Sequence, residues 1–206
     1  MITIALKKAK EFKIIENKDL EETDYVFFYR LSQFSCLDFA TIRLCCKDKS
    51  GRCVTKTRLD NLVANGYLRT KPIFYKPYKC NVIIYKLTQK SIDVLKLRHK
   101  DQLIVLNSKA DPHDLHQARY ITDNYLEYID SYKHEKYLQK ELNLTNYQKE
   151  KYSTLDGYID IGDTRVYIET ISSYYNKEQK IKKNNFINYL QSENSNIRVI
   201  TQRYNH

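Results

Sequence analysis

The segment LDGYIDIGDTRVYIETI, at residues 155–171, alternates apolar and polar residues on both sides of a Gly-Asp pair. This alternation is typical of two half-buried β-strands, and Gly162-Asp163 is typical of the tight turn that joins such strands. A hairpin of this kind must cover its apolar face with other elements. Because segments with helical spacing surround it, the sequence predicts an α+β chain.

Two carboxylates belong to this hairpin: Asp156 precedes the first strand and Glu169 lies within the second. Carboxylate oxygens are the ligands that Mg²⁺ prefers, and Mg²⁺ neutralises the charge that develops on a phosphate during cleavage. Alternation places Glu169 beside Tyr167 and Ile171, where an unpaired carboxylate would be costly. Glu169 therefore needs a positive partner. The candidates are a metal ion, Lys177, Lys180 and Arg119.

Two further acids lie near the turn of the hairpin. Asp163 follows Gly162 in the turn itself, where both residue types serve the backbone conformation, so we assign Asp163 to structure. Asp160 shares a face with Tyr158. The sequence leaves open whether Asp160 is a metal ligand or a solvated residue at the edge.

The positive charge of the chain is confined to its first half. The net charge is +10, and residues 1–100 carry 21 lysines and arginines against 10 acidic residues, whereas residues 101–206 carry 14 against 15. A basic half joined to a neutral half is typical of a polyanion-binding module attached to a second unit. The charge distribution therefore predicts a polyanion as a partner of the first half, and the winged helix described below makes this partner double-stranded DNA.

The composition also bears on location. No apolar run approaches the roughly 20 residues that span a bilayer, and the N-terminal segment MITIALKKAKEFK lacks the apolar core of a signal peptide. The five cysteines include no CxxC pair, so reduced thiols are expected. These features predict a cytoplasmic chain without a membrane partner. A zinc site built from Cys45, Cys46, Cys53 and His99 would lack the usual ligand spacing.

Three helices and a hairpin are predicted in the first half. The helical segments are 25–34, with Asp24 as the cap, 36–47, and a third that ends at Asn65-Gly66. Strands follow from residue 67 and again after Pro77, and a short helix closes at 89–97. The residues expected to face the core of the second and third helices are Leu37, Ala40, Ile42, Leu44, Val54, Leu59, Leu62 and Val63. Helix, helix, helix, hairpin is the order of a winged helix-turn-helix.

The segments TRLDNLVANGYLRT and IIYKLTQKSIDVL resemble winged-helix DNA-binding domains, with a recognition helix, NGYL entering the wing and YKLT leaving it. The basic residues agree with this resemblance, because donors on the helix suit base edges and phosphates, and cations on the wing suit phosphates. The candidate DNA-binding residues are Arg52, Thr55, Lys56 and Arg58 in the helix and Arg69, Lys71, Lys76 and Lys79 in the wing. Two alternatives remain open: Arg58 as a structural ion-pairing residue, and a winged helix that binds protein.

The second half is predicted to begin after a linker near residues 99–111, which divides the chain into domains 1–100 and 111–206. Asp111-Pro112 starts a long helix over 113–132. The hairpin follows, then a helix at about 176–191 and a strand at 196–204. Helix, strand, strand, helix, strand is the core order of the PD-(D/E)XK nuclease fold.

The segments HDLHQARYITDNYLEYID, LDGYIDI and RVYIETISS with KEQKIKKNNFINY resemble the replication-relaxation family of plasmid and mobile-element proteins. The resemblance implies an N-terminal winged helix-turn-helix followed by a small α/β restriction-endonuclease-like domain. It also implies a DNA-bound role in replication, relaxation or transfer. A homodimer and replication or transfer proteins are the partners that such a role would involve.

In the PD-(D/E)XK fold, Asp156 and Glu169 would bind Mg²⁺, and a lysine two residues after the second acid would orient the attacking water. That position holds Ile171, which cannot position a water. Lys177 or Lys180 could substitute, and residues of the leading helix could complete the site: Glu127, His113 or Gln117. Because of Ile171, we expect a nuclease-like domain that is not catalytic and has no cofactor.

Three other functions remain open. The first is a Mg²⁺-dependent endonuclease that the winged helix directs to DNA. The second is a scaffold that binds proteins of a replication or transfer complex. The third uses Tyr174 as the nucleophile of a relaxase, although no His-hydrophobe-His metal triad accompanies it in the sequence.

Overall fold

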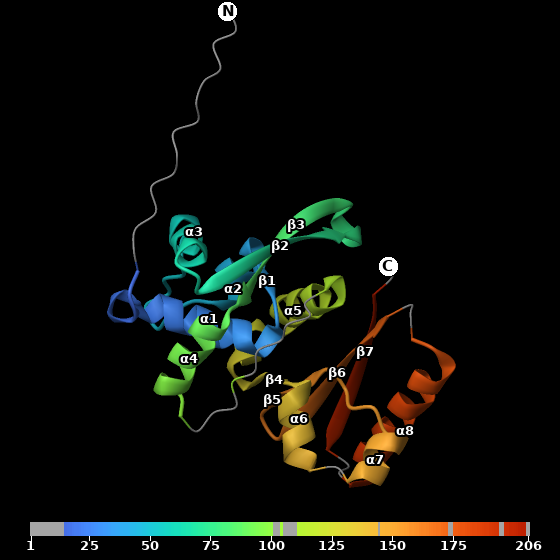
Figure 1. Ribbon diagram of the computed structural model, residues 1–206. Helices are drawn as coiled ribbons and strands as arrows, with labels where there is room; N and C mark the ends of the chain where they lie inside the picture. Colours follow the sequence, from blue (N-terminus) through green and yellow to red (C-terminus); the bar gives the residue numbers. More distant parts are fainter. Residues whose placement is uncertain are drawn as a thin grey trace, which may run out of the picture.

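Two β-sheets organise the protein in the computed structural model, which describes residues 15–100, 104, 111–143, 145–172, 175–193 and 196–204. One sheet has three strands in the order β1-β3-β2, and the other has four strands in the order β4-β5-β6-β7 (Figure 1). Helices pack against both sheets. The mixed α+β class that the sequence predicted is therefore confirmed.

Three helices precede the main hairpin of the first sheet. They are α1 (Glu22–Phe34), α2 (Phe39–Cys45) and α3 (Lys56–Ala64), with the short strand β1 (Leu37–Asp38) between the first two. The strands β2 (Leu68–Tyr75) and β3 (Cys80–Leu87) pair antiparallel, and α4 (Gln89–Arg98) follows. Two single-turn 3-10 helices, η1 (Asn17–Asp19) and η2 (Lys76–Tyr78), complete this half. The predicted order of three helices and a hairpin is observed.

The start of α1 differs from the prediction. The N-cap is Glu21, and Asp24 lies at the third helical position, where its carboxylate accepts a hydrogen bond from the Glu21 backbone N–H at 2.8 Å. Asp24 is fully buried, and its charge is compensated by an ion pair with Arg58 of α3, in which Nη2 and Oδ2 are 2.5 Å apart. Sequence reasoning took a short acidic side chain for the cap and missed this contact between two helices.

The second helix is shorter than the segment 36–47 that the sequence predicted. Asp38 caps α2 by accepting from the Thr41 backbone N–H at 3.1 Å, and Leu37 lies in β1 instead of the helix. Ile42 is buried, whereas Ala40 and Leu44 are exposed, so these two predictions of core positions were wrong. A helix of seven residues buries only one narrow stripe, and these two residues lie outside it.

The third helix and its end agree better with the prediction. Thr55 caps α3, and Gly66 follows the helix with φ +73°, a conformation that glycine adopts readily. Val54, Leu59 and Leu62 are buried, and Val63 is partly buried against the same core.

The second half begins with α5 (Pro112–Tyr125), which Asp111 caps and Pro112 opens as predicted. The predicted helix over 113–132 ends early, because the chain tightens after Tyr125 into the 3-10 helix η3 (Leu126–Ser131). The elements that follow are β4 (Lys133–His134), α6 (Glu135–Leu142), α7 (Asn146–Lys151), β5 (Gly157–Ile161), β6 (Thr164–Ser172), α8 (Lys177–Glu193) and β7 (Ile197–Tyr204). The predicted hairpin is β5–β6.

The second sheet lies between two layers of helices. Tyr158 and Tyr167 face α6 and α8, and pack with Leu138 and Phe186 of those helices. Alternate residues of the same strands face the opposite way, where Ile159 and Ile168 join a core that includes Ala118 and Ile121 of α5. β7 pairs parallel to β6, and α8 makes the crossover between them. Across the described ranges, no helix is both long enough and apolar enough to cross a bilayer.

The two sheets are joined through α5, which lies between them (Figure 1). Phe34 of α1 stacks on Tyr132 with the ring centroids 4.7 Å apart, and Arg30 donates a hydrogen bond to the Ile129 carbonyl at 2.6 Å. Arg119 of α5 forms an ion pair with Asp38. The predicted linker falls mostly outside the described residues, so the division into domains 1–100 and 111–206 stays a prediction.

Candidate functional site

The two acids of the β5–β6 hairpin converge with a lysine from α8. Gly157 pairs with Ile168, so Asp156 and Glu169 are neighbours across the two strands. The Nζ atom of Lys183 lies 2.8 Å from Oε2 of Glu169 and 4.0 Å from Oδ1 of Asp156. The side chains of Asp156, Glu169 and Lys183 are only 12%, 2% and 12% exposed. We call these three residues the carboxylate–lysine site.

The surrounding backbone holds this site in place. The Thr170 backbone N–H donates to Oδ2 of Asp156 at 2.7 Å, and Lys183 donates to the Thr154 carbonyl at 2.5 Å. Oε1 of Glu169 is buried and, among the described residues, has no donor in ordinary hydrogen-bond geometry, although the Tyr175 hydroxyl interacts with the same carboxylate. A buried carboxylate oxygen without a well-placed donor is costly, so this oxygen can accept a further partner.

The helix α5 brings a histidine to the same place. Nε2 of His113 lies 2.7 Å from the Thr170 carbonyl oxygen, and it must donate because a carbonyl only accepts. The same nitrogen lies 3.7 Å from Oδ2 of Asp156. Of the three residues that the sequence offered for the leading helix, His113 therefore reaches the site. Gln117 lies deeper and donates to the Tyr132 hydroxyl at 3.3 Å, and Glu127 is exposed on η3.

The carboxyl groups of this region hold their protons more tightly than usual. Burial and the neighbouring Asp156 raise the pKa of Glu169 to about 7, although Lys183 opposes the shift. Burial also raises the pKa of Asp156. On α5, burial and Asp111 raise the pKa of Asp114 to about 7. The negative charge of the ionised acids therefore exceeds what Lys183 neutralises, which is typical of functional sites.

These observations fit a divalent cation of the Mg²⁺ class. Asp156 and Glu169 present hard carboxylate oxygens from two adjacent strands, and Oε1 of Glu169 lacks a well-placed donor among the described residues. A bound cation would satisfy that oxygen and stabilise the ionised forms of both acids. The residues that would hold it are Asp156 and Glu169.

The raised pKa of Glu169 predicts how the stability of the protein depends on pH. Its pKa rises from 4.5 to about 7 in the folded protein, so between these values the folded state binds more protons than the unfolded state. The free energy of unfolding of the metal-free protein should therefore fall as the pH rises through this window. Glu169→Gln stays neutral and should raise stability at pH 8 by on the order of 1–3 kcal/mol, with little change near pH 4.5. Urea denaturation in EDTA at both pH values measures this difference.

The matched control for this experiment is Asp160→Asn on the same hairpin. Asp160 pairs with Arg165 at 2.7 Å, and its side chain is 43% exposed. We expect this variant to leave the pH dependence unchanged. A lower stability of Glu169→Gln than of the wild-type protein at pH 8 would contradict the assignment.

The lysine of the site was not among the sequence-based candidates. Lys177 and Lys180 lie in the first turns of α8 and are exposed, whereas Lys183 lies one turn further and faces the sheet. Lys183 precedes the buried residues Phe186 and Leu190 by three and seven positions, which places it on the buried stripe of the helix. That spacing was the signal available in the sequence.

The other candidates of the second half lie elsewhere. Arg119, offered as a partner of Glu169, pairs with Asp38 instead. Asp160 is partly exposed and pairs with Arg165 on the adjacent strand, and Asp163 lies in the turn as assigned. Tyr174 lies outside the described residues.

The candidate DNA-binding residues of α3 and the loop before it are engaged within the fold. Arg52 pairs with Asp48 at 3.0 Å, and Lys56 pairs with Asp60 at 2.5 Å, yet both side chains remain largely exposed. Thr55 accepts from the Arg58 backbone N–H as the cap of α3. Arg58 is only 14% exposed because it pairs with Asp24. The structure therefore supports the structural alternative for Arg58.

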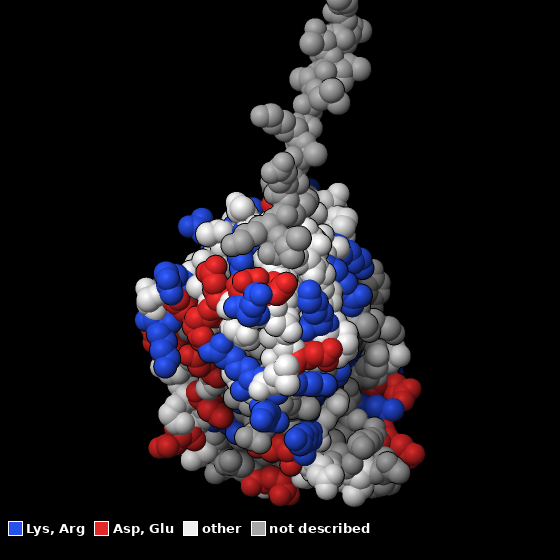
Figure 2. Space-filling view, turned by 60° about the vertical axis from the view of Figure 1, so that its left-hand side comes forward, with Lys and Arg blue, Asp and Glu red and all other residues white. Residues whose placement is uncertain are grey.

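The β2–β3 hairpin carries the remaining candidates, Arg69, Lys71, Lys76 and Lys79, and all four are exposed. Residues 68–87 contain five lysines and arginines and no acidic residue. By contrast, lysine, arginine and acidic side chains are interspersed on the face that Figure 2 shows, which the left-hand part of Figure 1 forms. The hairpin therefore differs from that face in carrying charge of one sign.

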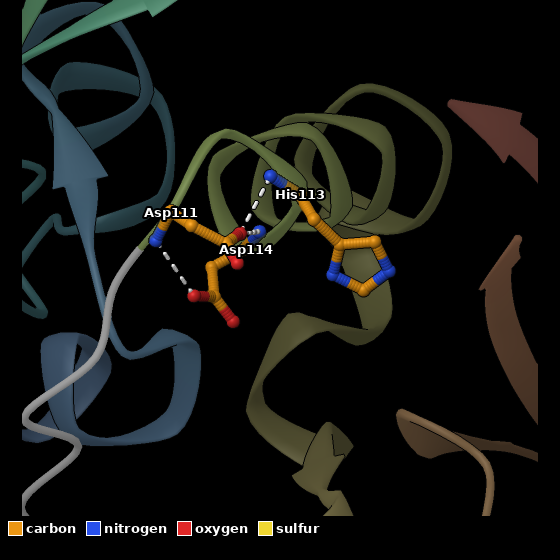
Figure 3. Close-up of side chains that lie close together, drawn as sticks. All are labelled: Asp111, His113 and Asp114. Atoms are coloured by element: carbon orange, nitrogen blue, oxygen red, sulfur yellow. Dashed lines mark hydrogen bonds between the residues drawn. The ribbon is translucent and has the colours of Figure 1, made fainter. Parts of the chain in front are cut away.

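One further cluster has the composition of a metal site. Ligand atoms of Asp111, His113 and Asp114 lie within 4.8 Å of one another. Figure 3 shows that the His113 ring points away from the two carboxylates. Asp111 accepts from the backbone N–H groups of His113 and Asp114, and Asp114 accepts from that of Asp111. These bonds are the capping box of α5, so we assign the two acids to the helix start.

The zinc hypothesis finds no support in the first half. The described cysteines are all free, and His99 packs on the ring of Tyr29 with the centroids 5.3 Å apart. Cys45 and Cys46 are buried neighbours whose sulfur atoms lie 3.6 Å apart. Within the part of the chain that the structure describes, these thiols and His99 do not form a group of metal ligands.

Comparisons with known proteins bring no independent identification. No protein-family model, no curated protein and no solved structure matches the chain. The chemistry of the residues themselves, above all of the carboxylate–lysine site, is what indicates a function.

Proposed function

We propose that this chain is a DNA-binding protein that cleaves phosphodiester bonds with a divalent metal ion held by Asp156 and Glu169. The convergence of these two acids with Lys183, together with the lack of a well-placed donor at Oε1 of Glu169, carries the proposal. The bound ion would lower the pKa of a water and neutralise charge on the phosphate. Lys183 supplies a positive charge at the same place, and His113 donates to the carbonyl of Thr170, whose N–H donates to Asp156.

The order of the elements supports DNA as the substrate. The helices α1, α2 and α3 before the β2–β3 hairpin are compatible with a winged helix-turn-helix, and α5, β5, β6, α8 and β7, with β4, α6 and α7 inserted after α5, are compatible with a PD-(D/E)XK nuclease core. The excess charge of the hairpin suits phosphates. Together with the resemblance to replication-relaxation proteins, these features favour a role in replication, relaxation or transfer of a plasmid or mobile element. A homodimer and other replication or transfer proteins are the expected partners.

A second candidate is the same DNA-binding protein with a nuclease-like half that does not cleave. One observation favours it: Lys183 lies within 2.8 Å of Glu169 and so neutralises that acid without a metal ion. We place it second because only the apolar residue Ile171, at the position of the usual lysine, spoke against catalysis. Lys183 supplies, from α8, the cation that Ile171 cannot.

The experiment that separates the two candidates is nicking of supercoiled plasmid in Mg²⁺ or Mn²⁺. The wild-type protein should nick the plasmid, and Asp156→Ala/Glu169→Ala should lose at least about 10³-fold in rate, since both metal ligands are gone. Asp160→Ala, an exposed acid of the same hairpin, serves as the matched control and should retain activity.

A gel shift of the same plasmid decides how a negative result is interpreted. A wild-type protein that binds the plasmid but does not nick it would favour the second candidate. Nicking that survives in Asp156→Ala/Glu169→Ala would place the reaction at a different site and overturn the proposal.

A further inference from the structure

The strand β7 ends the strand order β4-β5-β6-β7 of the second sheet and has two faces of different character (Figure 1). Val199 packs against the core that α8 forms with the sheet. Because successive residues of a strand alternate between its faces, Thr201 and Arg203 share the face of Val199. Tyr204 points the opposite way and stacks on Tyr75 at 6.2 Å, in agreement with this alternation. We call the face with Val199, Thr201 and Arg203 the α8 face of β7.

The carboxylate–lysine site lies on the same face of the sheet. The parallel pairing of β6 and β7 places Thr201 beside Glu169 and Arg203 beside Ile171. Glu169 points toward α8, where Lys183 pairs with it at 2.8 Å. Adjacent strands are about 4.8 Å apart and two residues of a strand span about 6.6 Å, so the Cα atoms of Arg203 and Glu169 are about 8 Å apart. Arg203 is therefore at the border of the site, next to the position that carries a lysine in PD-(D/E)XK nucleases.

This end of β7 is the open border of the site. Thr201 and Arg203 are exposed, whereas the side chain of Glu169 beside them is only 2% exposed. On the side of Asp156, the start of α6 closes the site, because the Glu135 backbone N–H donates to the Asp156 carbonyl at 2.8 Å. The helix α5 covers the other face of the sheet. A substrate of the two acids therefore approaches them across β7.

Arg203 has a positive charge that is available to a substrate. Arg119 and Arg165, two other arginines of the second half, are both engaged in ion pairs. Among the described residues, Arg203 forms no ion pair, and β7 itself contains no acidic residue. A guanidinium presents two parallel N–H donors, which match two oxygens of a phosphate. The exposed end of β7 is thus suited to hold one phosphate group.

The site needs such a cation at its border. Asp156 and Glu169 repel the phosphates that flank the bond to be cleaved. Lys183 cannot hold these flanking phosphates, because its side chain is only 12% exposed and its ammonium group already donates to Glu169 and to the Thr154 carbonyl. A second positive charge, outside the acids and open to solvent, would offset the repulsion.

We propose that Arg203 binds a phosphate of the DNA strand next to the phosphate that lies at Asp156 and Glu169, so that the strand enters the site across β7. The inference rests on the proposed function and adds to it the residue that holds the substrate backbone and the side from which the substrate arrives.

The first test measures binding to a labelled duplex by fluorescence anisotropy, in EDTA so that no cleavage occurs. Arg203→Ala should reduce the slope of log K against log salt by about 0.9, since one phosphate contact is lost. The matched control is Arg198→Ala, because Arg198 is an exposed arginine of the same strand that lies on its opposite face. This control should leave the slope unchanged.

The second test measures nicking of supercoiled plasmid in Mg²⁺. Arg203→Ala should lower kcat/KM by about 10- to 100-fold, the loss expected for hydrogen bonds to a charged group. Most of this loss should appear in KM, because the flanking phosphate is bound both before and during cleavage. Arg203→Lys keeps the charge but not the paired donors and should recover part of the loss. Arg198→Ala should nick as the wild-type protein does.

Two results would overturn the inference: equal salt slopes of the wild-type protein and Arg203→Ala, or the same reduction of the slope in Arg198→Ala. A wild-type protein that binds the duplex without nicking it would refute the nuclease proposal alone, because the two slopes still decide whether Arg203 holds a phosphate. A wild-type protein that binds no duplex at low salt would overturn both the inference and the proposed function.

Discussion

Lys183→Ala should lower the rate of metal-dependent plasmid nicking by at least about 10²-fold, the loss typical of removing one preorganised charge from an active site. Nζ of Lys183 lies 2.8 Å from Glu169 and 4.0 Å from Asp156, and it is held by the Thr154 carbonyl. Contacts with Glu169 and with the Thr154 carbonyl therefore fix the position of the Lys183 ammonium group. Single-turnover nicking, with enzyme in excess over plasmid, measures the change without a contribution from product release.

The controls for this prediction are the two lysines that the sequence favoured. Lys177→Ala and Lys180→Ala remove exposed cations from the first turns of the same helix and should nick at the wild-type rate. Lys183→Arg keeps the charge and should recover part of the activity. Loss of nicking in Lys180→Ala with retention in Lys183→Ala would contradict the geometry described for α8.

Arg58→Ala should destabilise the protein by about 3–5 kcal/mol, the cost of leaving a buried charge without its partner. Asp24 is fully buried, and the guanidinium of Arg58 contacts both of its carboxylate oxygens. The same side chain donates to the Asp19 carbonyl at 2.8 Å. Urea denaturation at pH 7 measures the loss, and we expect weaker DNA binding by this variant only to the extent that it unfolds.

A paired variant separates structure from recognition. Asp24→Asn/Arg58→Met removes both charges and should recover most of the stability, since no buried charge is then left alone. Arg69→Ala is the contrasting variant, because its side chain is exposed on β2 and its loss should leave stability within about 0.5 kcal/mol. A fully stable Arg58→Ala with lost DNA binding would restore Arg58 as a contact residue.

Periodicity and turn residues were sufficient to predict much of the fold. The alternation around Gly162-Asp163 predicted β5 and β6, and Asp111-Pro112 predicted the start of α5. The sequence did not predict the features that depend on tertiary contacts. Asp24 was taken for a cap because nothing local reveals that Arg58 approaches it. Leu44 was placed in the core because apolar character alone does not say on which side of a short helix a residue lies.

The sequence likewise predicted one part of the candidate site and missed another. Hairpin register makes Asp156 and Glu169 neighbours, so the sequence could place the two acids together. Which lysine of α8 reaches them depends on how that helix is rotated over the sheet, and this is set by Phe186 and Leu190 in the core. The contribution of His113 likewise depends on where α5 lies against β6. His113 and its partner Thr170 are more than fifty residues apart along the chain.

The contacts between α1 and η3 have a consequence for the order of events during synthesis. The guanidinium of Arg30 is buried, yet its acceptor on Ile129 and its partner Asp130 lie about a hundred residues later in the chain. Chains emerge from the ribosome N-terminal end first, and early segments fold as soon as their contacts exist. Here the core that contains Phe34 stays incomplete until Tyr132 has emerged, so a nascent chain stalled before that point would display an open apolar surface to chaperones.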